Sequence, residues 1–210
     1  EIQNSEGAVL DHFNGTLFPI VFDREGTYST LANDNEGTEV TFTQQKNILY
    51  KGRCEVVDGR FEYRFIVPRD VAYNYDYGKL SHYARSNSIP DDASGNYQKI
   101  LFGGFNEDAA QSTDRPSVRL FINDSSFRDG GITDCNPSIF AILADSAGIN
   151  SVGSGLGHDI TATLDENGST IMVLNDFYET DFNDPRRGYI NYKLTGLTPG
   201  QHTLVLKAWN

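Results

Sequence analysis

The chain contains little cysteine, which limits the chemistry that thiols can supply. Only Cys54 and Cys135 occur among its 210 residues, too few for a disulfide scaffold or for a metal site built from several thiolates. Cys54 lies on the same face of a predicted strand as Val56, so we expect it to be a small buried hydrophobic residue. Cys135 lies in a polar turn without a neighbouring cation or histidine to stabilise a thiolate. A disulfide between the two cysteines would have to join two domains, and it remains an alternative.

Long apolar runs and an excess of positive charge are also missing. No stretch reaches the roughly 18 apolar residues that a transmembrane helix needs, so no membrane-spanning segment is predicted. The chain has 29 acidic and 17 basic residues, a formal net charge of −12. Phosphate backbones and anionic membrane surfaces repel such a chain, which argues against nucleic-acid binding and leaves calcium or a basic partner open. No signal peptide is recognisable, and both ends resemble cuts from a longer chain, so this absence does not locate the parent protein.

Alternation of apolar and polar residues dominates the sequence. From Arg60 to Val67, aromatic and aliphatic side chains alternate with charged ones, which predicts a half-buried strand. The same pattern recurs in segments such as Glu39–Thr43 and His202–Ala208. About fourteen short strands separated by turn residues, with no convincing helix, are typical of β-sandwiches. The predicted fold is all-β, with two consecutive immunoglobulin-like antiparallel β-sandwich domains.

Turn chemistry and composition suggest the domain boundaries. We expect a first β-sandwich domain over residues 1–104, a polar linker over 105–115 and a second, immunoglobulin-like β-sandwich domain over 116–210. Asn167-Gly168 predicts a hairpin turn in the second domain, and Pro199-Gly200 predicts a turn before the last strand. Since that strand has the character of a penultimate one, the second domain is predicted to be truncated at its C-terminal strand.

The sequence offers no convincing catalytic, cofactor-binding or metal-binding residue. The glycine-rich segment Gly153–Gly157 precedes a predicted strand rather than a helix, so a surface loop is favoured over a phosphate-binding loop. None of the four histidines has another histidine or a cysteine at metal-ligand spacing. No Gly-x-Ser-x-Gly nucleophile elbow occurs. An independent hydrolase is therefore only a residual alternative.

Acidic and aromatic clusters permit weaker alternatives. Asp91–Asn96 and Asp176–Asp184 could supply oxygen ligands to calcium from predicted loops, although neither matches a calcium-binding loop motif and solvated loops are favoured. Tyr73, Tyr75 and Tyr77 could stack on sugars, although packing inside a sandwich is the favoured role. No cofactor is therefore predicted, and calcium remains an alternative.

Ordered motifs along the chain resemble a known family. Four segments of the second half resemble, in order, the region that follows the peptidase domain in gingipain-family cysteine peptidases, and the type IX secretion system sortases of the Bacteroidetes match best. Three segments of the first half resemble the part that precedes this region. The second-half segments are Asp145–Asn150, Gly155–Ala162, Val173–Tyr178 and Leu197–Leu204, and the first-half segments are Asp11–Pro19, Lys46–Gly52 and Phe65–Ala72.

The resemblance implies a role without catalysis for this part of the parent. The catalytic cysteine and histidine of the family lie in an upstream peptidase domain, and no position here matches their motif. The parent would remove the C-terminal signal of secreted cargo and attach the cargo to surface lipopolysaccharide. It would lie outside the cell or at the outer-membrane surface of a Gram-negative bacterium. The partners implied are the parent's peptidase domain and secretion-system or cargo proteins.

Two segments are the best candidates for interaction loops. They contain His158 and Asp159, and Asp176, Tyr178 and Asp181, and both overlap or adjoin the matched motifs at predicted strand ends. The alternative is that these residues only fix loop conformations. For the protein as a whole, the alternative function is a carbohydrate-binding or adhesin module of a secreted surface protein.

Overall fold

The fold is built from antiparallel strands. The computed structural model describes residues 1–33, 37–67, 75–88, 90–104, 115–152, 157–165 and 171–210. Within these ranges the chain forms fourteen strands and one short 3-10 helix, and every pair of strands is antiparallel. The all-β class expected for immunoglobulin-like sandwiches is therefore confirmed.

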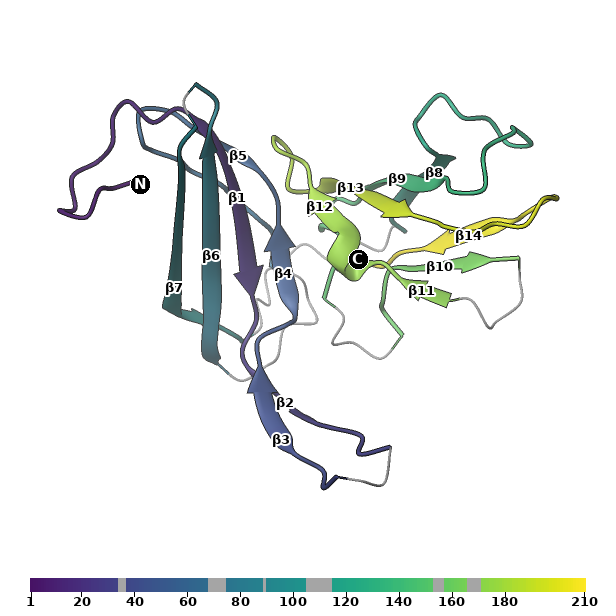
Figure 1. Ribbon diagram of the computed structural model, residues 1–210, viewed down its shortest axis with the longest axis horizontal. Coiled ribbons are helices and arrows are strands. Elements are labelled where there is room, and N and C mark those ends of the chain that lie inside the picture. The colour runs from purple at the N-terminus through teal and green to yellow at the C-terminus, as the bar shows by residue number, and fades with distance from the viewer. Residues whose placement is uncertain (34–36, 68–74, 89, 105–114, 153–156, 166–170) are drawn as a thin grey trace.

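The strands fall into two groups along the chain (Figure 1). The first half contains β1 (Gly15–Phe22), β2 (Gly26–Ser29), β3 (Thr41–Gln44), β4 (Ile48–Lys51), β5 (Cys54–Val56), β6 (Asp76–Ser86) and β7 (Asp92–Phe102). The second half contains β8 (Ser117–Ile122), β9 (Ser138–Ala144), β10 (Thr161–Leu164), β11 (Ile171–Val173), helix η1 (Asn175–Phe177), β12 (Tyr178–Thr180), β13 (Arg187–Lys193) and β14 (Leu204–Lys207).

In the first half, β1 lies at the centre of a five-stranded sheet. The strand order is β4-β1-β6-β7, and β5 also pairs with β1. Leu17, Pro19 and Val21 of β1 are fully buried, whereas Phe18 and Ile20 between them are half-buried, as expected for a strand with one buried face. Ile2 and Phe13 pack on the same face as Leu17 and the buried Cys54. The core of the first half therefore lies on one face of this sheet.

The strand predicted between Arg60 and Val67 is not formed. Residues 61–67 belong to no strand, yet Phe61, Tyr63 and Phe65 are partly buried and pack against the cores of the first half. The Tyr63 hydroxyl hydrogen-bonds His82 Nε2 at 2.8 Å, and its ring stacks on Tyr50 at 5.5 Å. The alternation thus identified which side chains face the sheet, but side chains rather than a ladder hold this segment.

The prediction of a loop at Asp91–Asn96 is also wrong, because most of this segment is part of a strand. Asp92 begins the eleven-residue strand β7, where it lies opposite Arg85 and accepts a hydrogen bond from the Tyr83 hydroxyl at 3.1 Å. Among the described strands, β7 pairs only with β6, and most of its residues are exposed. Polar residues can therefore form this strand without burial of their side chains.

Strands β2 and β3 form a separate two-stranded hairpin, which pairs with none of the other described strands. It projects from the rest of the molecule (Figure 1). We call β2, β3 and the described residues between them the arm. The rings of Tyr28 and Phe42 face each other across the arm at 6.0 Å, and Lys46 Nζ lies 4.1 Å from the centre of the Tyr28 ring.

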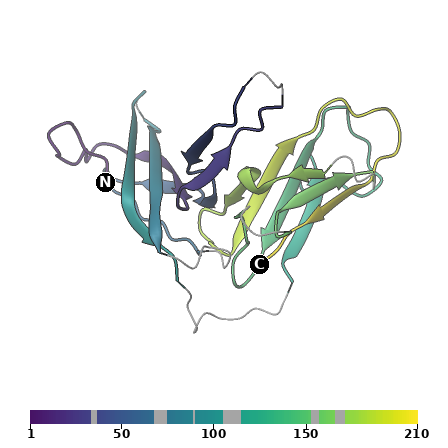
Figure 2. The ribbon, with the colours of Figure 1, turned by 90° about the horizontal axis from the view of Figure 1, so that it is seen from below.

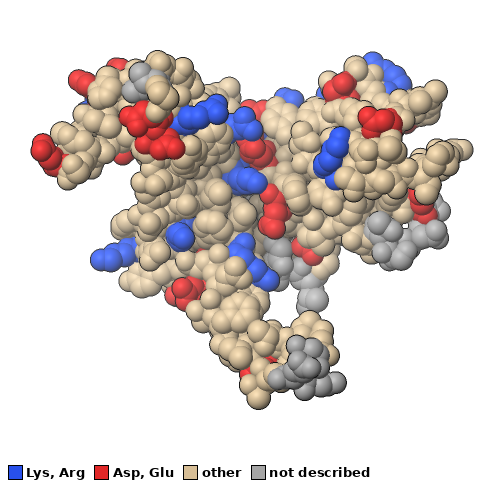
Figure 3. All heavy atoms as spheres, in the orientation of Figure 1, with Lys and Arg blue, Asp and Glu red and all other residues tan. Residues whose placement is uncertain are grey.

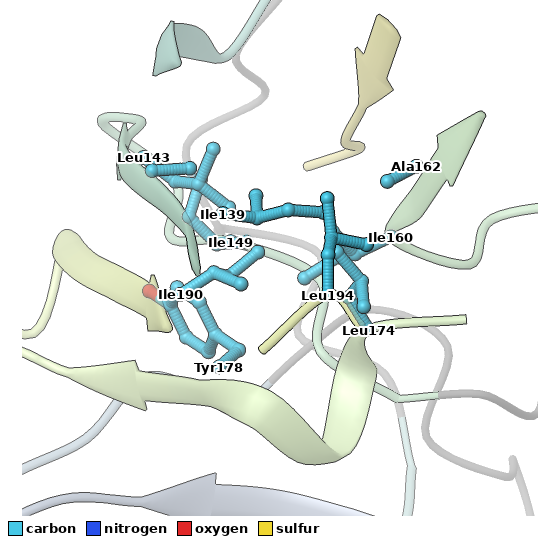
Figure 4. Packing of buried hydrophobic residues seen from close by; sticks show 10 residues of the cluster. Ile139, Leu143, Ile149, Ile160, Ala162, Leu174, Tyr178, Ile190 and Leu194 are labelled. Carbon is cyan, nitrogen blue, oxygen red and sulfur yellow. The ribbon is translucent and has the colours of Figure 1, made fainter. Parts of the chain in front are cut away.

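The second half is a sandwich of two sheets (Figure 2). One sheet has the order β11-β10-β14 and the other β12-β13-β9-β8. Ile139 and Leu143 of β9 and Ile190 of β13 pack against Ile160 and Ala162 at β10, and all five are fully buried (Figure 4). Inward-facing residues of the two sheets thus supply one shared core.

Several predicted features lie outside the described residues. These include positions 105–114 of the expected linker, residues 153–156 of the glycine-rich loop, the Asn167-Gly168 turn and Tyr73. The hairpin expected around Asn167-Gly168 is consistent with the pairing of β10 and β11, in which Thr163 lies opposite Ile171. Within the described ranges, no helix is long and apolar enough to cross a membrane.

Candidate functional site

The two segments with the predicted interaction residues meet at one end of the second sandwich. Residues 157–160 lead into β10, and residues 174–178 form η1 and enter β12. The buried side chain of Asn175 joins them, because its Oδ1 accepts a hydrogen bond from the Ile160 amide at 3.1 Å. Its Nδ2 donates to the carbonyl of Ser151 at 3.1 Å. Asn175 therefore fixes three chain segments relative to one another.

Residues 145–152 form a loop that its own polar side chains hold. Buried Asp145 accepts hydrogen bonds from the Ala147 amide at 2.7 Å and from Asn210 Nδ2 at 3.2 Å. Buried Asn150 accepts one from the Val152 amide at 3.1 Å. Buried polar groups need such partners, and here they determine the shape of the loop.

This loop packs against the first half of the chain. Val152 is fully buried in one cluster with Val21, Leu49 and Tyr50 of the first sheet. Gly148 has a φ of +91°, and a Cβ built on it would lie 3.2 Å from Cγ2 of Ile66. Glycine thus permits both the left-handed backbone and the close approach.

Polar contacts flank this apolar contact between the loop and the first half. Strands β4 and β12 lie side by side (Figure 1), and Lys51 Nζ donates to the backbone carbonyl of Asp176 at 2.9 Å. Arg53 pairs with the Glu179 carboxylate through Nε, and through Nη2 at 3.3 Å. Basic and acidic side chains are interspersed where the two halves meet (Figure 3). We call this set of apolar and polar contacts the junction.

The junction also affects the acid–base properties of Tyr50. Burial, followed by the neighbouring Cys54, Tyr63 and Glu179, raises the pKa of Tyr50 to about 12. Its ring stacks on that of Phe65 with centres 5.0 Å apart. Tyr50 is therefore a neutral packing residue at physiological pH.

The five predicted interaction residues occupy different environments. The His158 ring packs on Trp209 with centres 5.5 Å apart, and Asp159 is half-buried. Asp176 is exposed in η1 and contributes its backbone carbonyl to the junction. This hydrogen bond from Lys51 links η1 to the first half.

Tyr178 and Asp181 contribute to packing and to a turn of the second sandwich. Tyr178 lies in β12 with 5% exposure in the core of the sandwich, and burial raises its pKa. The Tyr189 hydroxyl hydrogen-bonds the Asp181 carboxylate. That bond, with the Asn183 amide as a second donor, lowers the pKa of Asp181. Asp181 thus closes the turn between β12 and β13.

Sequence reasoning missed the first-half side of the junction. Tyr50, Lys51 and Arg53 were not singled out individually, although Tyr50 and Lys51 fall within a matched motif. Glu179 was passed over between Tyr178 and Thr180, although alternation places it on the opposite face of β12 from these buried residues. This alternation was the local sequence signal that could have identified Glu179 as a residue facing away from the core.

The thiols and acidic groups show no reactive arrangement in the part of the chain that the structure describes. Both cysteines are unpaired, and burial raises the pKa of Cys54 to about 11, which disfavours a thiolate. Exposed Cys135 lies 3.2 Å from Nδ2 of Asn136. No group of three or more His, Cys, Asp or Glu side chains among the described residues is arranged to hold a metal ion.

Comparison with known proteins shows that the chain is similar to a solved structure. No protein-family model matches the chain, and no curated protein does. The crystal structure of dimeric latent PorU from Porphyromonas gingivalis is similar, with 31% sequence identity and a TM-score of 0.51. The match covers 99% of this chain and 19% of the PorU chain. The chain is therefore related to a part of PorU over almost its whole length.

Proposed function

We propose that the chain is a non-catalytic accessory region at the C-terminal side of a gingipain-like cysteine peptidase that acts as a type IX secretion sortase. The similarity to PorU at 31% identity over 99% of the chain carries this proposal, and the ordered family motifs support it. The chain spans only 19% of the PorU chain. The chemistry would therefore belong to the rest of the parent, at the cell surface of a Gram-negative bacterium.

Within that parent, the chain would act as a rigid support. The junction joins the two halves through one buried apolar cluster and two flanking polar contacts. A fixed relation between two β-rich units suits a region that supports the peptidase domain or presents a surface to secretion-system and cargo proteins. The segments with the family motifs Asp145–Asn150 and Val173–Tyr178 form or adjoin this junction.

The test uses the gene that encodes the parent. Deletion of the part that encodes this chain should abolish removal of the cargo signal and attachment of cargo to lipopolysaccharide, measured by mass spectrometry of secreted proteins. The isolated chain should not hydrolyse peptide substrates. Peptidase activity of the isolated chain, or normal cargo processing by the shortened parent, would contradict the proposal.

We also infer that the parent self-associates. The related PorU structure is dimeric and latent, and the similarity extends over nearly all of this chain. Light scattering on the purified parent would give its mass directly, and a monomer at all concentrations would contradict this inference.

A carbohydrate-binding or adhesin role is the second candidate. Tyr77, Tyr83 and Tyr97 on β6 and β7 are 55%, 43% and 52% exposed, and such rings offer an apolar face with a polar edge to a ligand. A glycan array probed with the chain, with and without calcium, tests it. Binding that Tyr97→Ala abolishes would favour this role, whereas the absence of binding would remove its support.

A further inference from the structure

The first sheet has an open edge at β7 (Figure 1). Among the described strands, β7 pairs only with β6. Natural sheets usually protect such an edge with proline, with charged side chains or with a covering segment, because an unpaired strand is a template for another strand. Residues 93–98 of β7 include no proline and no charged residue, and all but the first of them are exposed. This part of the edge therefore lacks the usual protection.

The hydrogen bonds of the sheet show which way the backbone of β7 points. Residues that lie opposite each other in an antiparallel ladder direct their N–H and C=O groups either toward each other or away from each other. The carbonyl of Pro19 accepts a hydrogen bond from the amide of Gly52 at 3.2 Å, on the β4 side of β1. Pro19 lies opposite His82, so the backbone groups of His82 point away from β1 and toward β7. There His82 lies opposite Gly95, which therefore points back toward β6.

Ser94 and Asn96, on either side of Gly95, consequently point their backbone groups away from the sheet, because successive residues of a strand alternate in direction. Neither residue has a backbone hydrogen bond on this outer side within the described part of the chain. Their two N–H groups and two C=O groups face solvent. They form a short row of donors and acceptors of the kind that an added strand uses.

Gly95 leaves space beside this row. A Cβ built on Gly95 would meet no atom within 4 Å, and a glycine inside a strand often marks a place where another backbone approaches closely. The ring of His82, opposite Gly95, packs on Phe61 with centres 5.7 Å apart. Tyr97 lies two residues from Gly95 on the same face and is 52% exposed. An added strand can therefore place an apolar side chain beside the Tyr97 ring.

We propose that residues 92–97 of β7 bind an extended, uncharged segment of a cargo protein, which adds a strand to the first sheet. The row of backbone groups selects an extended polypeptide, and the lack of charge on residues 93–98 favours an uncharged one. A cargo protein that is cleaved next to its C-terminal signal has to present an extended chain there. The choice of cargo as the partner rests on the proposed sortase function, whereas the choice of this edge rests on β7 itself.

Fluorescence polarisation with labelled peptides tests the inference. The probes are overlapping peptides of about 12 residues, longer than a typical strand, which cover the C-terminal signals of proteins that the same bacterium secretes. At least one uncharged peptide should bind the chain with a Kd of roughly 1–100 μM. Asn96→Pro should raise this Kd at least about tenfold, because it removes an outward N–H group. Asn96→Ala keeps the backbone donor and should leave Kd within about twofold.

Two controls separate loss of the edge from loss of the fold. Proline is tolerated on an edge strand where its missing N–H would face solvent, so Asn96→Pro should unfold at nearly the same temperature as the unmodified chain. Methylation of alternate backbone nitrogens in the bound peptide leaves the protein unchanged, and it should also raise Kd at least about tenfold. Binding that resists both Asn96→Pro and this methylation would overturn the inference.

Two further outcomes would also overturn it. If no peptide from the cargo signals binds, the edge is not a cargo site, and the deletion test of the proposed function is unaffected. If the amides of Ser94 and Asn96 are protected from hydrogen exchange in the full-length parent without cargo, another part of the parent covers the edge. Fast exchange of both amides in the parent, and slower exchange once the peptide is added, is the expected result.

Discussion

Replacement of Asn175 by alanine should strongly destabilise the second sandwich. This side chain is 7% exposed and satisfies two buried backbone groups, the Ile160 amide and the Ser151 carbonyl. Ile160 is fully buried and Ser151 is 7% exposed, so water cannot readily replace the lost partner. The expected result is a loss of stability far above that of an ordinary surface substitution.

The magnitude follows from the two groups left without partners. Each buried donor or acceptor that loses its hydrogen bond costs about 1–3 kcal/mol. Two such groups give about 2–6 kcal/mol, and relaxation of the loop makes about 3 kcal/mol our central expectation. For a protein of this size, that corresponds to a fall in Tm of about 6–12 °C.

The assay is urea unfolding followed by fluorescence of Trp209, the only tryptophan of the chain. This residue reports on the correct region, because its carbonyl accepts a hydrogen bond from the Asn150 amide at 2.9 Å. Asn191, which is exposed on β13, provides the matched control: Asn191→Ala should change stability by less than about 0.5 kcal/mol. A similarly small effect of Asn175→Ala would refute the reasoning.

Asn175→Asp adds a test with a characteristic pH dependence. Its carboxylate can still accept the Ile160 amide, but it places a second acceptor against the Ser151 carbonyl and buries a charge. Once protonated, the carboxyl can donate to that carbonyl as the amide did. The variant should therefore regain stability relative to the unmodified chain as the pH falls toward 4, and no such gain would show that the donor role is unimportant.

Three further predictions concern the junction and the buried titratable groups. Arg53→Glu should lower the free energy of unfolding by about 0.2–1 kcal/mol, because the Arg53 and Glu179 side chains are 56% and 31% exposed. Adding Glu179→Arg should restore most of this stability in a double-mutant cycle measured by urea unfolding. Strict additivity of the two substitutions would contradict a direct pairing. Burial, and then the N-terminal charge, lowers the pKa of His82. Below the unfolded value of about 6.5, the unfolded chain therefore binds a proton that the folded chain does not. The stability of the fold should fall as the pH drops from about 6.5 to the lower folded pKa. Thermal unfolding at a series of pH values checks this, and a His82→Gln variant with the same pH dependence would exclude His82 as the cause. A maleimide reagent should modify exposed Cys135 much faster than buried Cys54, and equal rates by mass spectrometry would contradict the burial of Cys54.

Local patterns in the sequence predicted the strands well where a strand has one buried face. In β1 and β9, buried residues alternate with half-buried ones along the whole strand, and the sequence carries the same alternation. The pattern failed at residues 61–67, where aromatic side chains pack on the sheet but the backbone joins no ladder. Alternation reports which side chains face a core, and it cannot report whether a neighbouring strand is available for pairing.

The opposite error occurred at the start of β7. Asp91–Asn96 was interpreted as a loop because it is polar, yet Asp92 to Asn96 are strand residues that are mostly exposed. A strand with little burial carries no hydrophobic signal, so only its partner β6 reveals it. Strand β3 is a contrasting case, because the alternation in Glu39–Thr43 predicts a strand there although every residue of β3 is exposed.

The junction was beyond local reasoning because its parts are far apart in the chain. Lys51 and Asp176 are separated by 125 positions, and Arg53 and Glu179 by 126. Each of these residues alone reads as an ordinary surface group. The resemblance to the gingipain family marked several of the segments that meet there, but the contact itself follows only from the packing of the two halves.

Apolar contact rather than charge should determine how the two halves of the chain sit together. The Arg53–Glu179 pair is partly exposed and is worth at most about 1 kcal/mol. Full burial of a valine such as Val152, which is 0% exposed, contributes about 1.5–3 kcal/mol. The glycine at position 148 then sets how closely the loop can approach, because a side chain there would press against Ile66. High salt should therefore weaken the junction only slightly, whereas Val152→Asp should open it, and this asymmetry is what a support of fixed geometry requires.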